Sequence, residues 1–268
     1  MLSFTKMNGA GNDFIMVDNR SQSLQLTKAQ IAQLCDRHRG IGADGLLAVE
    51  PAQSGADARM RYYNADGGEV EMCGNGARCF ARFVQRLEGG GRQAVSFETQ
   101  AGILSASCEG ELVRLAMSLP HGLEMAARLA VADTTLEVHS LNTGVPHAVV
   151  VVEDLESTPI VKWGAALRYH EHFQPKGTNA NFMKVLAPGR IAIRTYERGV
   201  EDETLACGTG MVACALIHHL LHGASSPVSV EVRGGDTLHI GFTATGDSFA
   251  NVTLTGPADF VFDGQAAL

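Results

Sequence analysis

Cys73-Gly74-Asn75-Gly76 and Cys207-Gly208-Thr209-Gly210 are two copies of one short signature, half a chain apart. Each copy follows an acidic, glycine-containing run and precedes an apolar stretch. The repeat extends upstream, since Arg61-Tyr62-Tyr63-Asn64 precedes the first copy and Arg194-Thr195-Tyr196-Glu197 the second. The sequence therefore predicts two related halves, each with a cysteine at the start of a helix.

The two signatures indicate a specific chemistry. A helix start offers unpaired backbone N–H groups and a positive dipole end, which favour a thiolate. The glycines let a ligand approach the backbone, and such an N–H cluster binds an anion, a carboxylate being the simplest. A lone cysteine at a helix start is more often a packing feature. Two matched thiols on opposite faces of one carbon, however, would invert it by removing and returning a proton, so Cys73 and Cys207 are predicted to form a coupled acid/base pair.

The composition narrows the class of protein. The chain has 268 residues, 45% hydrophobic and 19% charged, as in globular proteins of one large or two smaller domains. A net charge of −8 without a basic cluster argues against nucleic-acid binding. No apolar run approaches the roughly 20 residues of a membrane span, and no signal peptide is visible, so we expect a cytoplasmic protein with reduced cysteines. The cysteines at 35, 79, 108 and 214 fit structural roles.

Short strand-like runs dominate both halves. A capping box at Thr27 predicts a helix that ends at Gly40. Further helices are expected after Cys73, ending at Gly89-Gly90-Gly91, near Ile160–Tyr169, and after Cys207, ending near Gly223. The expected strands are Ser3–Met7, Phe14–Asp18, Gly45–Glu50, Ala58–Asn64, Ala94–Thr99, Ile103–Cys108, Leu112–Ser118, Leu136–Leu141, His147–Val152, Asn181–Val185, Ile191–Tyr196, Val228–Val232, Leu238–Phe242 and Phe249–Leu254.

This pattern predicts an α+β fold of two pseudo-symmetric lobes, each a curved, mainly antiparallel sheet around a central helix. Strands and helices do not alternate regularly, which disfavours a doubly wound parallel sheet. We place the N-terminal lobe at residues 1–118, completed by a C-terminal strand at 259–268, and the C-terminal lobe at 119–258.

Other sites are disfavoured. The glycines of 40–45 lack the strand and helix of a dinucleotide fingerprint, and neither a phosphate-binding loop nor a pyridoxal phosphate site is apparent, so we expect no cofactor. We also expect no metal site: the spacing of Cys73 and Cys79 is not that of zinc ligands, and His218 and His222 fit a solvated or dipole-favoured helix end better than a metal pair.

At this point the sequence resembles the diaminopimelate epimerase family, whose members use two cysteines and no cofactor. The resemblance runs in order over nearly the whole chain. It is carried by Met7–Phe14, Arg37–Asp44, Tyr63–Gly67, Cys73–Arg78, Gly144–His147, Gly177–Asn179, Tyr196–Gly199 and Glu203–Gly210.

The resemblance implies interconversion of LL- and meso-diaminopimelate in bacterial lysine and cell-wall precursor synthesis, in a cleft between the lobes, by a protein that is commonly a homodimer. It implies Cys73 and Cys207 as the acid and base, and His147 and Glu197 as supporting catalytic residues or, alternatively, structural ones that orient loops. The remaining implied substrate contacts, with Glu197 also among them, are Asn12, Asn64, Gly74, Asn75, Asn179, Arg198, Gly208 and Thr209. An arginine guanidinium suits a carboxylate, and amides suit both carboxylate and ammonium groups.

The sequence departs from the family pattern at four places. Val145 stands where asparagine is usual, so one expected polar substrate contact is missing. Gly45 replaces a frequent glutamine, and Phe262 replaces the usual tyrosine of the dimer contact. The interval from Arg198 to Cys207 is one residue longer than the commonest pattern.

Two other functions compete with the epimerase. A related two-cysteine racemase for proline or histidine would not need Asn64, Asn179 and Arg198, which suit a second amino-acid head group. A ligand-binding protein without catalysis would not need both cysteines with both glycine cradles. A thiol-redox protein, the remaining alternative, would form a labile bond between Cys73 and Cys207, which the symmetry of the two halves permits.

Overall fold

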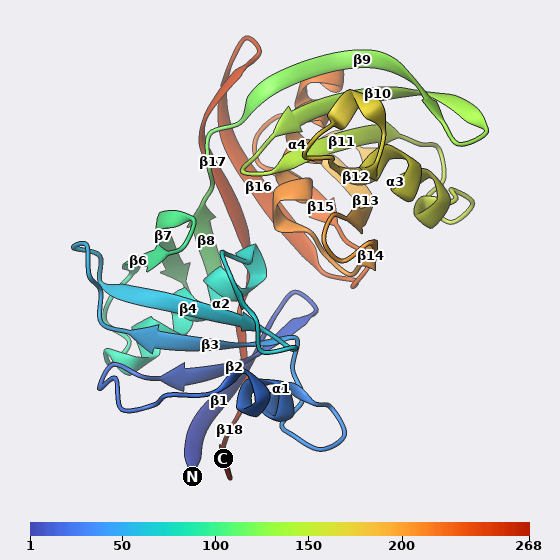
Figure 1. Cartoon of the computed structure of the whole chain (residues 1–268). Helices are drawn as coiled ribbons and strands as arrows, with labels where there is room; N and C mark the ends of the chain where they lie inside the picture. The colour runs from blue at the N-terminus through green and yellow to red at the C-terminus, as the bar shows by residue number, and fades with distance from the viewer. The chain divides into compact units, whose positions relative to one another are not determined.

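The computed structural model describes all residues, 1–268, and confirms the α+β prediction with four α-helices and eighteen strands. The chain forms two compact units (Figure 1). Unit 1 comprises Met1–Ala116 and Gly256–Leu268, and unit 2 comprises Met117–Thr255. None of the helices is both long and apolar enough to span a bilayer.

Unit 1 begins with a hairpin and ends with a strand from the far end of the chain, since β18 pairs with β1. Its elements are β1 (Leu2–Gly9), β2 (Asn12–Asp18), α1 (Lys28–Cys35), β3 (Gly45–Glu50), β4 (Ala58–Asn64), β5 (Glu69–Val70), α2 (Gly74–Leu87), β6 (Ala94–Thr99), β7 (Gly102–Glu109), β8 (Leu112–Ala116) and β18 (Asp259–Ala266).

Unit 2 repeats this order of elements. They are β9 (His121–Val131), β10 (Thr134–Asn142), β11 (Pro146–Val151), α3 (Ile160–Arg168), a 3-10 turn (Glu171–Phe173), β12 (Asn179–Ala187), β13 (Arg190–Glu197), β14 (Asp202–Thr204), α4 (Gly208–His222), β15 (Val228–Glu231), β16 (Thr237–Thr245) and β17 (Ser248–Pro257), whose last two residues belong to unit 1.

The strand pairing confirms the predicted pseudo-symmetry. Most neighbours are antiparallel, and the parallel pairs fall at matching places: β2–β3 and β4–β6 in unit 1, β11–β12 and β13–β15 in unit 2. One helix connects each parallel pair, as a parallel connection requires a crossover. The same fold is therefore built twice, with α2 and α4 in equivalent places.

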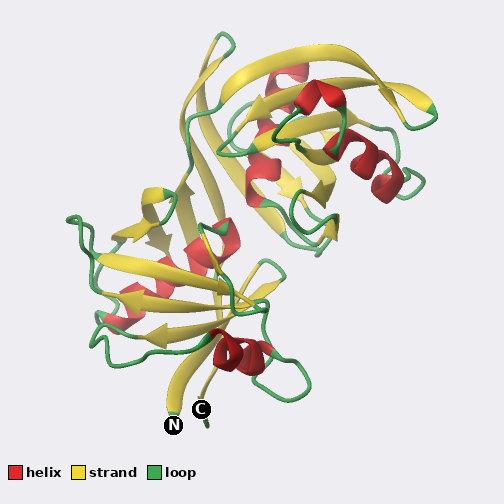
Figure 2. Ribbon diagram, in the orientation of Figure 1, coloured by secondary structure: helices red, strands yellow, loops and turns green.

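The two cysteine helices lie at the centres of the units, surrounded by strands (Figure 2). Helix α2 packs against β1–β4 and β6–β8, and α4 packs against β10–β13, β15 and β16. Met211, Val212, Leu216 and Ile217 of α4 are fully buried, and each contributes about 2 kcal/mol of hydrophobic stabilisation. Gly223 ends α4 in the left-handed conformation, with φ 65°.

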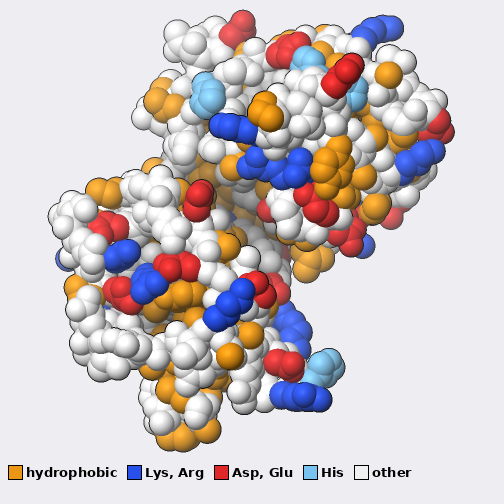
Figure 3. All heavy atoms as spheres, viewed as in Figure 1, with side chains coloured by type: hydrophobic (Ala, Val, Ile, Leu, Met, Phe, Trp, Pro, Cys, Tyr) orange, Lys and Arg blue, Asp and Glu red, His pale blue; other side chains and the backbone are white.

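Charged side chains of both signs are mixed on the surface. On the face shown in Figure 3, basic and acidic side chains are interspersed over both units. Several form pairs, such as Arg61 with Glu69 at 2.7 Å and Arg86 with Asp263 at 2.6 Å. Such exposed or partly exposed pairs contribute little to stability individually.

Three predictions about individual elements were wrong. Helix α1 ends at Cys35 rather than Gly40, because the Asp36 carboxylate accepts hydrogen bonds from the N–H groups of His38 and Arg39 and turns the chain. Gly40 then passes so close to the helix that a Cβ would lie 2.0 Å from the Gln33 carbonyl oxygen.

The second error concerns strands. The sequence did not reveal β5, β9 or β14, and β9 is long but mostly exposed, so it lacks the alternation of a half-buried strand. The third concerns His218, which is fully buried in the core of unit 2 rather than solvated. His222 does lie in the last turn of α4.

Candidate active site

Cys73 is the N-cap residue of α2. Its backbone is extended, with φ −139° and ψ 125°, and its carbonyl oxygen accepts the first helical hydrogen bond from the Ala77 N–H at 2.8 Å. The side chain makes no capping hydrogen bond. The N–H groups of Gly74, Asn75 and Gly76 therefore keep the anion-binding capacity of an open helix start.

Cys207 has the same position on α4. Its φ is −122° and its ψ 108°, and its carbonyl oxygen accepts the Met211 N–H at 2.9 Å. Here too the side chain does not cap the helix, although Sγ lies 3.7 Å from Thr209 Oγ1. Cys207 is 6% exposed, whereas Cys73 is partly exposed. Gly208 and Thr209 thus match Gly74 and Asn75 as the first residues of their helix.

The first turn of α2 packs on an apolar floor. A Cβ on Gly76 would lie 3.2 Å from Leu47 and 3.4 Å from the Phe14 ring. On the other side, a Cβ on Gly9 would lie 2.7 Å from the Asn75 carbonyl oxygen. These glycines allow the β1–β2 hairpin and α2 to approach closely.

The first turn of α4 packs on a polar floor instead. A Cβ on Gly210 would lie 2.3 Å from Asn181 Oδ1. That oxygen accepts a hydrogen bond from Thr195 Oγ1 at 3.0 Å, and Asn181 Nδ2 donates to the Ala148 carbonyl at 2.9 Å. The same Nδ2 lies 3.1 Å from His147 Nδ1.

His147 is buried beside this floor, on β11. It is 1% exposed, and its Nε2 has no hydrogen-bond partner. Burial, and secondarily the positive charge of Arg198, lower the pKa of His147 to about 3. The ring is therefore neutral at physiological pH and cannot act as an imidazolium acid.

Strand register relates the two floors. Phe14 pairs with Gly45 at the start of β2–β3, and His147 pairs with Asn179 at the start of β11–β12. His147 therefore occupies in unit 2 the place of Phe14 in unit 1, and Asn179 occupies that of Gly45. The halves match in backbone and differ in polarity.

Asn12 and Asn75 meet in unit 1. Asn12 opens β2, and its Oδ1 accepts a hydrogen bond from Asn75 Nδ2 at 2.7 Å. Asn64 ends β4 in a tight turn, where its N–H donates to the Gly68 carbonyl at 2.9 Å. The structure thus joins Asn12 to the cysteine helix, while Asn64 lies exposed on the turn that precedes β5.

Asn179, Glu197 and Arg198 meet in unit 2. Asn179 Oδ1 accepts the Arg198 N–H at 2.8 Å, and the Arg198 guanidinium donates to the Lys176 carbonyl at 3.1 Å. Glu197 Oε2 accepts a hydrogen bond from the Thr204 hydroxyl at 2.9 Å. Burial raises the pKa of Glu197, and the Thr204 bond only partly offsets this.

The remaining cysteines are core residues, as predicted. Cys35, Cys79, Cys108 and Cys214 are buried free thiols. Burial raises the pKa of Cys35 to about 11 and of Cys79 to about 12, and it also raises those of Cys108 and Cys214. These groups stay protonated and unreactive at neutral pH.

Sequence reasoning missed Asn181 and Asp44, which contact residues of the candidate site. A signal for Asn181 was present, since it lies two residues after Asn179 in a buried strand and so shares its face. No such sequence signal marks Asp44, because its contact with Asn12 depends on the pairing of β2 with β3.

Known proteins match this chain over its whole length. The sequence model of the family described as diaminopimelate epimerase matches residues 4–118 and 139–261. The diaminopimelate epimerase of Aquifex aeolicus is 40% identical, with 98% of this chain and 97% of that protein covered. That of Aromatoleum aromaticum is 43% identical, with 98% of each covered.

The chain belongs to the diaminopimelate epimerase family. A solved structure also shares the fold: a phenazine biosynthesis protein of the PhzF family from Bacillus anthracis has a TM-score of 0.72 at 15% identity, with 100% of this chain and 99% of that chain covered. At that identity the likeness concerns the fold alone.

Register places two of the departures from the family pattern. Val145 lies two residues before His147, as Asn12 lies two before Phe14, so Val145 is the unit 2 counterpart of Asn12. Gly45 is likewise the counterpart of Asn179. Each pair of equivalent positions in this member of the family therefore has one amide, not two.

Proposed function

We propose that this chain is a cofactor-independent isomerase that interconverts LL- and meso-diaminopimelate, with Cys73 and Cys207 as the two proton-transfer groups. The observation that carries the proposal is that both cysteines are N-caps of equivalent central helices in a duplicated fold. Each cysteine would act with the cradle of backbone N–H groups at the start of its own helix.

The proposed step balances without a cofactor. One cysteine, as thiolate, takes the α-proton, and the electron pair of the broken C–H bond moves into the adjacent carboxylate. The other cysteine, as thiol, delivers its proton to the opposite face, which inverts the carbon and exchanges the roles of the two sulfurs. N–H groups of Gly74, Asn75, Gly208 and Thr209 would stabilise the charge that develops on the carboxylate.

The protonation states and side-chain chemistry of the other site residues suggest their supporting roles. His147, neutral and with its proton on Nε2, would act as a hydrogen-bond donor. Glu197, whose pKa is raised by burial, would act as a supporting acid or base. Asn12, Asn64, Asn179 and Arg198 would bind the substrate, with Arg198 and the asparagines reading its distal amino-acid group. This distal set favours diaminopimelate over a substrate with one head group.

The decisive experiment uses LL-diaminopimelate in deuterated water, with reduced protein and no added cofactor. We expect meso product with deuterium at one α-carbon. Cys73→Ser and Cys207→Ser should each lower turnover by about three orders of magnitude or more, since serine is a far weaker acid than cysteine. Cys108→Ser, at a core thiol, is the matched control and should keep the wild-type rate. Absence of deuterium, or near-normal rates in either site variant, would contradict the proposal.

Homodimerisation and a cytoplasmic location stay predictions. Phe262, where the resemblance predicts a dimer contact, is 49% exposed and packs edge-on against Phe4 at 5.8 Å between ring centroids. Sedimentation equilibrium of the wild-type protein and of Phe262→Ala would test the dimer.

A further inference from the structure

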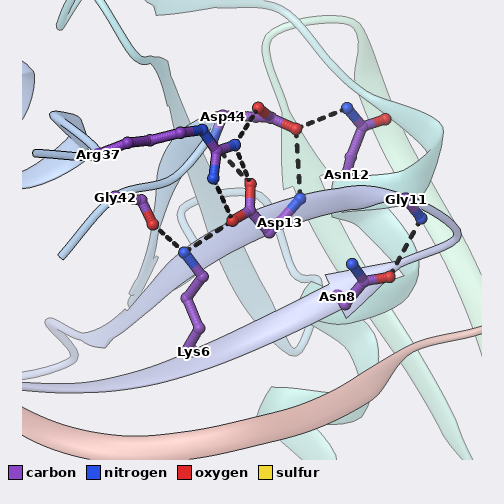
Figure 4. Close-up of polar contacts among 8 residues, drawn as sticks. All are labelled: Lys6, Asn8, Gly11, Asn12, Asp13, Arg37, Gly42 and Asp44. Atoms are coloured by element: carbon purple, nitrogen blue, oxygen red, sulfur yellow. Dashed lines mark hydrogen bonds and ion pairs between the residues drawn. The ribbon is translucent and has the colours of Figure 1, made fainter. Parts of the chain in front are cut away.

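Four charged side chains form a cluster beside Asn12 (Figure 4). We call Lys6, Asp13, Arg37 and Asp44 the ion cluster. Arg37 bridges the two acids, with Nη2 at 2.7 Å from both Asp13 Oδ1 and Asp44 Oδ1. Lys6 Nζ lies 2.8 Å from Asp13 Oδ2 and also donates to the Gly42 carbonyl. The cluster thus has two positive and two negative groups in mutual contact.

The ion cluster is partly withdrawn from solvent. The side chains of Lys6 and Asp13 are 8% and 18% exposed, whereas those of Arg37 and Asp44 are 56% and 37% exposed. Burial alone would raise the pKa of Asp13, but hydrogen bonds from Arg37 and Lys6, with their charges, lower it to about 2. The Asp13 carboxylate therefore stays ionised and holds both cations at neutral pH.

From Asp44, a chain of hydrogen bonds runs to the cysteine helix. Asp44 Oδ2 accepts from Asn12 Nδ2 at 2.9 Å. Asn12 Oδ1 accepts from Asn75 Nδ2 at 2.7 Å, and Asn75 Oδ1 accepts from Arg78 Nη2 at 2.9 Å. An ionised carboxylate can only accept and a guanidinium can only donate. The two ends therefore fix the orientation of both amides between them.

This chain ends in the first turn of α2. Arg78 is fully buried and also donates to the carbonyl of Gly9 at 3.2 Å, which joins the helix to the β1–β2 hairpin. Asn75 is itself the second residue after Cys73 and is 2% exposed. The orientation of its side chain is thus coupled to the backbone that surrounds the Cys73 sulfur.

Unit 2 lacks this chain of hydrogen bonds. By register, the counterparts of Asp44 and Asn12 are Thr178 and Val145, and the counterpart of Asn75 is Thr209. The first turn of α4 is held instead by a hydrogen bond from Thr143 Oγ1 to the Thr209 carbonyl at 2.9 Å. Loss of the ion cluster should therefore affect one cysteine only.

We propose that Asp44 is a positioning residue for Cys73: through Asn12 and Asn75 it holds the first turn of α2 in the arrangement that favours the Cys73 thiolate. The inference rests on the proposed function only in taking Cys73 as a proton-transfer group. Asp44 accepts a hydrogen bond from Asn12 and another from Arg37, so its influence on the first turn of α2 runs through the two amides.

The test measures the two thiols separately in one sample. Reduced wild-type and Asp44→Asn protein are alkylated with iodoacetamide over a range of pH, and modified peptides are quantified by mass spectrometry. We expect Cys73 in the variant to react about tenfold more slowly at pH 7, the size of effect that loss of a hydrogen bond to a charged group has. Cys207 should stay within about twofold of its wild-type rate, because its unit lacks the chain. Alkylation needs no turnover, so this result is independent of whether the epimerase proposal holds.

Two further variants complete the test. Asp18→Asn removes a charge from β2, the strand that holds Asn12 and Asp13; Asp18 pairs only with exposed Arg20, so this change should leave both thiols unchanged. Arg37→Gln cuts the ion cluster at its exposed end and decides the matter if Asp44→Asn does not fold; it should slow Cys73 several-fold and spare Cys207. Unchanged Cys73 reactivity in a folded variant, or equal slowing of both thiols, would overturn the proposal.

Discussion

Asn181 fixes the tautomer of His147. Its Nδ2 lies 3.1 Å from the ring Nδ1, and its Oδ1 is already held by the Thr195 hydroxyl at 3.0 Å. Because an amide nitrogen only donates, Nδ1 is the acceptor and the ring proton is on Nε2. The corresponding positions in unit 1 are Leu47 and Phe14, so this relationship exists in one half of the duplicated fold.

The His147 ring should show this state directly. We expect nitrogen NMR chemical shifts of a neutral Nε2–H tautomer throughout the range from pH 5 to 8, because burial and then Arg198 lower the pKa to about 3. Asn181→Leu, which copies Leu47, should abolish the fixed tautomer. A ring that titrates near its ordinary pKa of 6.5 would contradict this expectation.

The same pKa predicts a pH dependence of stability. The unfolded chain binds a proton at His147 below about pH 6.5, whereas the folded chain does so only near pH 3. Between these values the unfolded state holds more protons, so the free energy of unfolding falls as pH is lowered through this window. Urea denaturation at a series of pH values should show a smaller slope for His147→Gln. His38→Gln, at an exposed histidine of unit 1, should keep the wild-type slope.

The matched glycines Gly76 and Gly210 should respond differently to alanine. Gly76→Ala places a methyl group 3.2 Å from the end of Leu47, where a small shift relieves the contact. Gly210→Ala places one 2.3 Å from Oδ1 of Asn181, a side chain that three hydrogen-bonding neighbours hold through its Oδ1 and Nδ2. We expect the first change to alter the free energy of unfolding by less than about 1 kcal/mol, and the second to lower it by about 2–3 kcal/mol.

Chemical denaturation of the two alanine variants gives this comparison. Asn181→Ala makes space for the methyl group that Gly210→Ala introduces. The double variant should therefore lose less free energy of unfolding than the sum of the losses in the two single variants. Equal effects of the two single variants would mean that the polar floor under α4 is as adaptable as the apolar one under α2.

The main features of the fold follow from local signals in the sequence. Apolar stretches behind two Cys-Gly starts predict α2 and α4, and Gly223 predicts the end of α4. Strand β9 was not predictable in this way, because its residues are largely exposed and Ala126, with φ 61°, interrupts its regular conformation. The alternation that identifies a strand requires one buried face.

In the candidate site too, local features could be predicted and features that depend on strand pairing could not. The cysteines and their glycines are contiguous in the sequence, so their position at helix starts could be predicted. The contacts of Asn181 with His147 and of Asp44 with Asn12 each join residues more than thirty positions apart. They depend on the parallel pairing of β11 with β12 and of β2 with β3, which the sequence pattern did not reveal.

Glu197→Gln should stabilise the folded protein and lower its catalytic activity. Because burial raises the pKa of Glu197, the folded carboxyl binds a proton more readily than the unfolded one. The free energy of unfolding therefore falls as pH rises from the pKa of the unfolded carboxyl through that of the folded one. Glutamine removes this penalty and can still accept the Thr204 hydrogen bond. We expect a higher urea midpoint at pH 7 and a turnover lower by about 10²-fold.

A neighbouring acid provides a control of opposite sign. Glu203 on β14 is bound by Arg194 at 2.6 Å and by Arg233 at 2.8 Å, so Glu203→Gln should lower the urea midpoint. A Glu197→Gln protein that is less stable than wild type at pH 7 would show that the charged carboxylate is stabilised by its surroundings.

Val145→Asn should improve substrate binding. Register makes Val145 the counterpart of Asn12, and the resemblance to the family predicts an asparagine there that contacts the substrate. An amide at this partly exposed position would add a hydrogen bond to bound diaminopimelate in both ground and transition states. We therefore expect KM to fall by about three- to tenfold with kcat unchanged, as measured by initial rates. Val145→Thr, which keeps the branched shape but lacks the reach of an amide, should leave KM within about twofold. If the asparagine variant also keeps the wild-type KM, an amide at position 145 is not a substrate contact in this chain, and polar recognition of the substrate would depend on Asn12, Asn64, Asn179 and Arg198.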